Sequence, residues 1–174
     1  MSKPDLALHF QPAPHAPLLA RRLIPRKHMP LLHHAGVRNT IKKRIESLRP
    51  DSQRRWGRMT IDQMLWHVNV PLRESLGEYS APPNKVPIPR SLLRWLALTV
   101  PWPRGARTRP DMVAAVHHDF ELEKLRCLDL IDRFAHRDLN AVWPKSGNFG
   151  KMTGPHWSRL HAKHLDHHLR QFGV

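Results

Sequence analysis

The chain has 174 residues and a mass of 20.3 kDa, which predicts a single domain with room for one hydrophobic core. Its only cysteine, Cys127, rules out a disulfide framework within this sequence, and a membrane-spanning helix is excluded because no run of about 18 apolar residues occurs. These features indicate a reducing, cytoplasmic environment with no membrane partner. We interpret Cys127 as a small core residue, because it lies in an apolar helical pattern.

The formal net charge of +15 is unevenly distributed. Residues 37–60 carry eight basic and two acidic side chains, a net +6, whereas residues 111–174 carry nine basic and eight acidic ones, a net +1. A basic chain of this kind attracts polyanions through counterion release whatever its function. We therefore expect non-specific polyanion attraction only, and we keep a basic nucleic-acid-binding protein as the least favoured function.

Residues 1–36 are rich in proline and histidine and show neither helical nor strand periodicity. We interpret them as a flexible N-terminal extension, with Met29 as an alternative start. Residues 37–174 form the predicted domain. No region of this domain alternates with the period of a strand. Apolar residues recur at helical spacing in five segments, namely 37–48, 60–77, 91–100, 111–134 and 153–172.

This pattern predicts an all-α fold, an up-down four-helix bundle with a short extra helix (91–100) in a long proline-rich connection. Thr60 and Gln63 have the spacing of a capping box at the start of the second helix. Pro71 lies inside that helix and lacks the N–H that would donate to the carbonyl of His67. A kink is therefore expected at the turn that carries His67.

The last predicted helix contains a cluster of histidines. His164 and His168 are four residues apart, so they lie one turn above each other on its apolar side and can converge on one ion. His161 has helical spacing to both, whereas His167 is expected to point elsewhere. Such a pair is equally well explained by solvated or hydrogen-bonded core histidines, so the interpretation depends on a third ligand. A bundle can bring His67 of the second helix to the same core.

Two segments resemble the DinB-like superfamily of metal-binding helical bundles. The first comprises Arg-Trp-Gly-Arg-Met-Thr at 55–60 with Gln-Met-Leu-Trp-His at 63–67, and the second is His-Leu-Asp-His-His-Leu-Arg-Gln-Phe-Gly at 164–173. The second segment is most similar to a branch of unknown function. The resemblance covers roughly residues 37–174. Pro71, the Lys-Ser-Gly sequence at 145–147 and the first 36 residues depart from the pattern of that branch.

The resemblance implies a four-helix bundle in which His67, His164 and His168 hold one divalent metal, with zinc favoured and nickel or another transition metal as alternatives. Characterised relatives include thiol-dependent enzymes, namely bacillithiol transferases and a mycothiol-dependent maleylpyruvate isomerase. A low-molecular-weight thiol, a small-molecule substrate and a homodimer are expected on the same ground.

Three histidine ligands leave an open coordination position, which is typical of catalytic zinc sites. A metal there can activate water, leading to hydrolysis, or a thiol, leading to S-transfer. A metal-binding or stress-response bundle without catalysis is the alternative.

Other polar residues near the cluster are expected to have structural or orienting roles. Asp166 is expected to face away from the ligands and to form a salt bridge, and Gln171 is a candidate for orienting a ligand. His117 and His118 are interpreted as surface residues rather than ligands. The catalytic residues are left open, and the six tryptophans are assigned to the core and to pocket walls.

Overall fold

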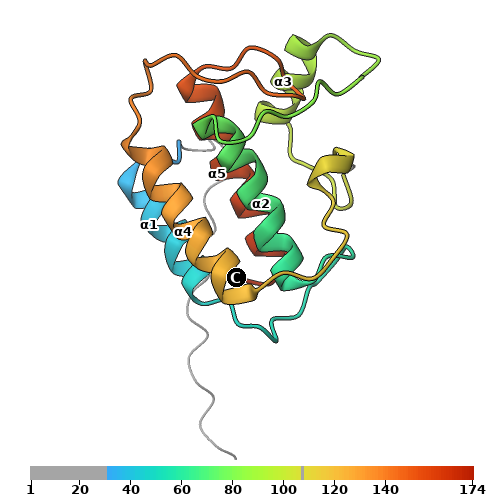
Figure 1. The fold of residues 1–174 in the computed structure, drawn as a ribbon, viewed down its shortest axis with the longest axis vertical. Coiled ribbons are helices and arrows are strands. Elements are labelled where there is room, and N and C mark those ends of the chain that lie inside the picture. The colour runs from blue at the N-terminus through green and yellow to red at the C-terminus, as the bar shows by residue number, and fades with distance from the viewer. Residues whose placement is uncertain (1–30, 107) are drawn as a thin grey trace, which may run out of the picture.

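The computed structural model describes residues 31–106 and 108–174. This part of the chain contains five α-helices and a short 3-10 helix, and no β-strand, so the all-α prediction is confirmed for it (Figure 1). In chain order the elements are α1 (Ala35–Glu46), α2 (Ile61–Leu76), α3 (Arg90–Thr99), η1 (Pro110–Met112), α4 (Phe120–His136) and α5 (Gly154–Gln171).

Four of the helices, α1, α2, α4 and α5, pack side by side around one hydrophobic core (Figure 1). α2 packs most extensively against α4, and both α1 and α2 contact α5. The short helix α3 lies at one end of the assembly and contacts α5. The largest fully buried side chains of the core are contributed by all four long helices and include Trp157, Phe134, Ile41, Leu65 and Leu169.

α5 is largely enclosed by the rest of the protein. Thr153 precedes it as N-cap and accepts a hydrogen bond from the backbone N–H of His156, which satisfies one of the free donors of the first turn. Most of its residues are buried, on nearly every side of the helix, including the polar Ser158, Lys163 and Asp166. A helix so enclosed places several polar side chains inside the protein, where each needs a partner.

α2 begins after Thr60, as the capping-box spacing predicts, and the backbone N–H of Thr60 donates to Oε1 of Gln63 at 3.1 Å. Pro71 is accommodated within the helix and is buried. Because it has no N–H, the carbonyl of His67 receives no intrahelical hydrogen bond from that position. Packing against α4 and α5 thus stabilises a helix that the local sequence alone would interrupt.

The predicted helix over 111–134 is wrong in its first part, because α4 begins only at Phe120. Asp119 acts as its N-cap and accepts from the N–H of Leu122 at 2.9 Å. The preceding segment instead crosses to α2, where Asp62 accepts the backbone N–H of His118 at 2.8 Å. Val113 and Val116, two of the apolar residues at helical spacing in the predicted segment 111–134, are exposed.

Residues 31–34 pack onto the helices although the predicted domain begins at 37. Leu32 is fully buried and donates its N–H to the carbonyl of Ser158. The ring of His33 bonds to Ser158 Oγ and to the carbonyl of Arg137 at 3.0 and 2.9 Å. The rest of the predicted extension, residues 1–30, lies outside the described residues.

None of the helices in the described part of the chain combines the length and the apolar character needed to cross a lipid bilayer.

Candidate metal centre

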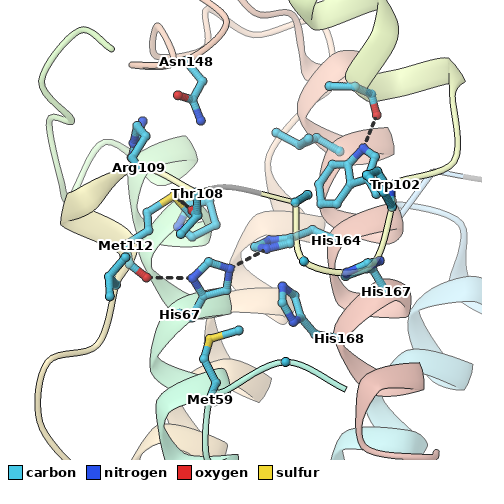
Figure 2. A pocket seen from close by; sticks show the side chains of 18 of the residues that line it. Met59, His67, Trp102, Thr108, Arg109, Met112, Asn148, His164, His167 and His168 are labelled. Carbon is cyan, nitrogen blue, oxygen red and sulfur yellow. Dashed lines mark hydrogen bonds between the residues drawn. The ribbon is translucent and has the colours of Figure 1, made fainter. Parts of the chain in front are cut away.

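The structure brings His67, His164 and His168 together. One ring nitrogen from each lies within 4.8 Å of the other two, and all three residues are buried (Figure 2). α2 supplies His67, and α5 supplies the other two on successive turns. In the part of the chain that the structure describes, this is the one group of three or more His, Cys, Asp or Glu residues with such spacing.

The orientation of the His67 ring is fixed by the backbone of η1. Its Nδ1 lies 2.8 Å from the carbonyl oxygen of Met112 (Figure 2). A carbonyl can only accept, so Nδ1 carries the proton and the neutral ring has its lone pair on Nε2. This nitrogen lies 3.0 Å from Nε2 of His164. When no ion is bound, the Nε2 lone pair of His67 accepts the Nε2–H of His164, and both nitrogens face the centre of the cluster.

The His168 ring is oriented in the same way by a side chain. Its Nδ1 lies 2.8 Å from Oε1 of Gln171, whose Nε2 donates to the carbonyl of Trp56 at 2.8 Å. The second bond fixes the amide so that Oε1 faces the histidine, and His168 Nδ1 must then donate. The proposed orienting role of Gln171 thus has the required geometry, and Nε2 of His168 is left for the cluster.

Burial keeps the three imidazoles neutral. It lowers the pKa of His67, lowers that of His168 to about 3, and lowers that of His164 well below its ordinary value. The neighbouring histidines lower the pKa values of His164 and His168 further, because two protonated imidazoles at such short distance would repel each other. Metal binding requires neutral histidine, so the site is in the competent protonation state at neutral pH.

This donor set fits a divalent transition metal. Three neutral ring nitrogens, two of them oriented by hydrogen bonds at the opposite nitrogen, are the usual composition of a catalytic zinc site. Nε2 of His67 and Nε2 of His164 are 3.0 Å apart, and all three ligand atoms lie within 4.8 Å of one another. Bonds of about 2.0–2.1 Å to one tetrahedral ion place such atoms roughly 3.4 Å apart, so a small movement of the rings brings them to that spacing. The three buried histidines therefore lie close enough to hold a metal ion.

The cluster opens into a cavity of about 970 Å³. Apolar and aromatic side chains form most of its wall, with Met59, Trp56 and Trp102 near the histidines. Leu93 and Leu96 of α3 also contribute to it. Asn84 and Asn148 line it as well, and Figure 2 shows Asn148 on the side away from the histidines. A cavity of this size and character is typical of a small-molecule site.

No carboxylate in the described residues is free to act on a ligand at the histidines. Glu74 lines the cavity but is bound by Arg109 and by the backbone N–H of Gly147. Asp166 faces away, as predicted, and pairs with Arg44 and Arg170 at 2.8 Å each. The acidic side chains near the site are therefore engaged by other groups of the protein.

The other histidines of α5 have separate environments. His161 is buried outside the cluster, stacks on Trp157 and bonds to Ser75 Oγ at 2.9 Å. His167 was expected to point elsewhere, and that expectation is wrong in part. It does not join the three ligands, but it lines the cavity between Trp102 and His168. His167 is partly buried on this wall.

His117 and His118 are not part of the cluster. The side chain of His117 is 77% exposed and lies 3.1 Å from Asp62, and His118 stacks on Trp66. Of the tryptophans, Trp143 and Trp157 are buried and Trp56, Trp102 and Trp157 line the cavity, as expected. Trp95 of α3 is 57% exposed, so its assignment to the core or a wall is wrong.

Sequence reasoning missed the Met112 carbonyl, because any residue type supplies a carbonyl and no motif marks it. It also missed the buried pair of Glu74 and Arg109. One signal was available for Glu74, which follows His67 by seven residues and so lies on the same face of α2.

Comparison of the chain with protein-family models, with curated proteins and with solved structures found no match.

Proposed function

We propose that the chain is a divalent-metal-dependent enzyme that transfers or rearranges groups through a low-molecular-weight thiol. His67, His164 and His168 are the metal ligands, and the adjoining cavity holds the thiol and its partner substrate. One observation carries the proposal: three neutral, buried histidines face the end of a largely apolar cavity of about 970 Å³. The resemblance to the DinB-like superfamily supports the same function and the four-helix-bundle architecture.

Thiol chemistry is favoured over hydrolysis by the surroundings of the histidines. A cation held by three histidines lowers the pKa of a thiol or a water that enters its open position. A hydrolase commonly adds a carboxylate or histidine general base. Here Glu74 and Asp166 are both engaged in ion pairs, which leaves His167 on the cavity wall as the candidate base for that alternative. An activated thiolate is itself the nucleophile and needs no base at the moment of attack.

The residues around the metal position orient the ligand histidines and surround them with apolar surface. Met112 and Gln171 hold two of the ligand rings so that Nε2 of each faces the metal position. Trp102 packs against His164 and Trp56 against His167, and together with Met59 they make the cavity wall beside the ligands apolar. A dry environment strengthens the electrostatic stabilisation of a bound anion such as a thiolate.

Metal content is the first test. We expect protein purified without a histidine tag to retain about one equivalent of a transition metal by elemental analysis, with zinc favoured. His164→Ala should lose it, whereas His117→Ala, which changes an exposed histidine, should retain it. Absence of metal in the wild type, also after incubation with zinc, would overturn the proposal.

Activity is the second test. The metal-loaded protein is assayed with small thiols and an apolar electrophile, and in parallel with ester and amide substrates. Thiol conjugation that requires His164 supports the proposal. Hydrolysis without conjugation would identify a hydrolase, and an intact metal site that is inactive in both assays would identify a non-catalytic metal-binding protein.

A further inference from the structure

A buried ionic network forms the cavity wall next to the candidate ligands. Arg109, which immediately precedes η1, is 3% exposed, and Glu74 of α2 is 2% exposed. The guanidinium donates to both oxygens of Glu74, at 3.3 Å from Nη1 and 3.1 Å from Nη2. It also donates to both oxygens of Asp111 at 3.0 Å. A buried cation with two bidentate carboxylate partners is held in one position.

Two further groups close the network. The hydroxyl of Tyr79 donates to Asp111 at 2.9 Å, and the backbone N–H of Gly147 donates to Glu74 at 2.7 Å. A Cβ at Gly147 would lie 2.5 Å from Nη1 of Arg109 and 2.6 Å from the carbonyl of Pro82, so glycine is required here by the close approach. The network thus joins α2, η1 and the loop before α5.

The network is connected to His67 through η1. Glu74 lies seven residues after His67, two turns along the same face of α2. Arg109 reaches from there to η1 and accepts the N–H of Met112 at its own carbonyl, at 3.0 Å. The carbonyl of Met112 then accepts the Nδ1 proton of His67 at 2.8 Å.

We infer that Arg109 is a positioning residue for the metal centre: anchored on Glu74, it fixes η1 so that the Met112 carbonyl holds His67 with its Nε2 lone pair toward the cavity. The metal part of this inference rests on the proposed function. The orientation of the ring does not, because it is a property of the protein alone.

An ionic network is not needed merely to form this part of the cavity wall. A buried carboxylate (Glu74), a partly buried one (Asp111) and a buried guanidinium are costly to desolvate, and apolar residues of similar volume are often as stable. The arrangement instead holds a backbone carbonyl in place, which apolar packing does with less directional precision. Hydrogen-bond partners of ligand histidines typically change metal affinity by about 10- to 100-fold when they are lost.

The test compares Arg109→Lys with Arg133→Lys. Both replace an arginine that pairs with two carboxylates, but Arg133 of α4 is half exposed and pairs with Asp129 of the same helix and with Glu78, which follows α2. Lysine keeps the charge and cannot make both bidentate contacts. Two quantities are measured: the His67 tautomer by ¹⁵N NMR of histidine-labelled, metal-free protein, and the affinity for Zn²⁺ by competition with a chromophoric chelator.

In the wild type we expect His67 to be held as the Nδ1–H tautomer. In Arg109→Lys we expect a mixture of tautomers and an affinity for Zn²⁺ at least about tenfold weaker, with neither change in Arg133→Lys. A lowered melting temperature with the wild-type tautomer and affinity would overturn the inference, because the network would then be structural only.

If Arg109→Lys does not fold, Glu74→Gln is measured in its place and interpreted by the same criteria. If the wild type binds no Zn²⁺, the proposed function fails, and the tautomer comparison alone decides whether Arg109 positions His67.

Discussion

Gln171 orients His168 from one turn further along α5, with 2.8 Å between Oε1 of the amide and Nδ1 of the ring. The same amide donates from Nε2 to the carbonyl of Trp56, in the segment that leads into α2. One side chain therefore links the direction of a candidate ligand to the packing of α5 against the segment before α2. Gly57 makes this possible, because a Cβ there would lie 2.5 Å from the Gln171 nitrogen.

Replacing Gln171 should weaken metal binding without abolishing it. In Gln171→Met the side chain keeps a similar length but cannot accept the Nδ1 proton of His168. We expect about 10- to 100-fold weaker binding of Zn²⁺ in a chelator competition. Gln53→Met is the matched control, since Gln53 is exposed and bonds only to the carbonyl of Asp51. Equal affinities in the two variants would show that the contact with His168 has no effect on the ligand.

Local sequence is enough to predict the starts of two helices and the spacing of two candidate ligands. Thr60 with Gln63, and Thr153, mark helix starts by chemistry that acts within four residues, and the structure has both starts where the sequence predicts them. The spacing of His164 and His168 likewise fixes their separation on α5. His67 was connected to them only through the resemblance and the general geometry of a bundle.

What the sequence could not predict depends on contacts between distant segments. Val113 and Val116 extend the helical periodicity toward the N-terminus, yet α4 begins only after its N-cap Asp119. The residues before it cross to α2, where Asp62 accepts the backbone N–H of His118. The pairing of Glu74 with Arg109 joins residues 35 positions apart. Nothing in the neighbourhood of either residue indicates the other, so the network that borders the site is visible only in three dimensions.

Asp166 should prove important for stability and not for metal binding. It is buried between Arg44 and Arg170, and Asp166→Asn would leave two guanidinium groups without their carboxylate. We expect the free energy of unfolding in urea to fall by about 3 kcal/mol. The affinity for Zn²⁺ should stay within about threefold of the wild type. A folded variant that had lost metal binding would contradict this assignment.

Asp51→Asn is the control for that measurement. The Asp51 carboxylate lies 3.6 Å from Arg49, and both side chains are about four-fifths exposed, at 80% and 78%. An ion pair of this kind contributes little, so the expected change in the free energy of unfolding is below about 1 kcal/mol.

Acid should destabilise the metal-free protein through its buried histidines. Burial lowers the pKa of His161 to about 3, with a smaller contribution from His33, whereas an unfolded chain titrates near 6.5. Between these values the unfolded state binds a proton that the folded state does not, so stability is complete above about pH 6.5 and falls as the pH is lowered toward 3. One such histidine accounts for up to about 1.4 kcal/mol per pH unit.

His161→Gln isolates this contribution, because glutamine can still bond to Ser75 and does not titrate. Urea unfolding of the chelator-treated protein at several values between pH 4 and 7 should give a shallower pH dependence for the variant, by up to one proton. Parallel curves for variant and wild type would mean that His161 is not neutral in the folded protein.

Cys127 should take no part in the thiol chemistry proposed for the cavity. It is fully buried on α4, and burial together with the nearby Glu123 raises its pKa to about 12. The thiol is therefore protonated and inaccessible. We expect it to react with a disulfide reagent at least about a hundredfold more slowly in the native protein than in urea. Cys127→Ala should retain any thiol-transfer activity, because the nucleophile enters from solution. Loss of activity in a folded Cys127→Ala protein with its metal in place would mean that the chain supplies its own thiol.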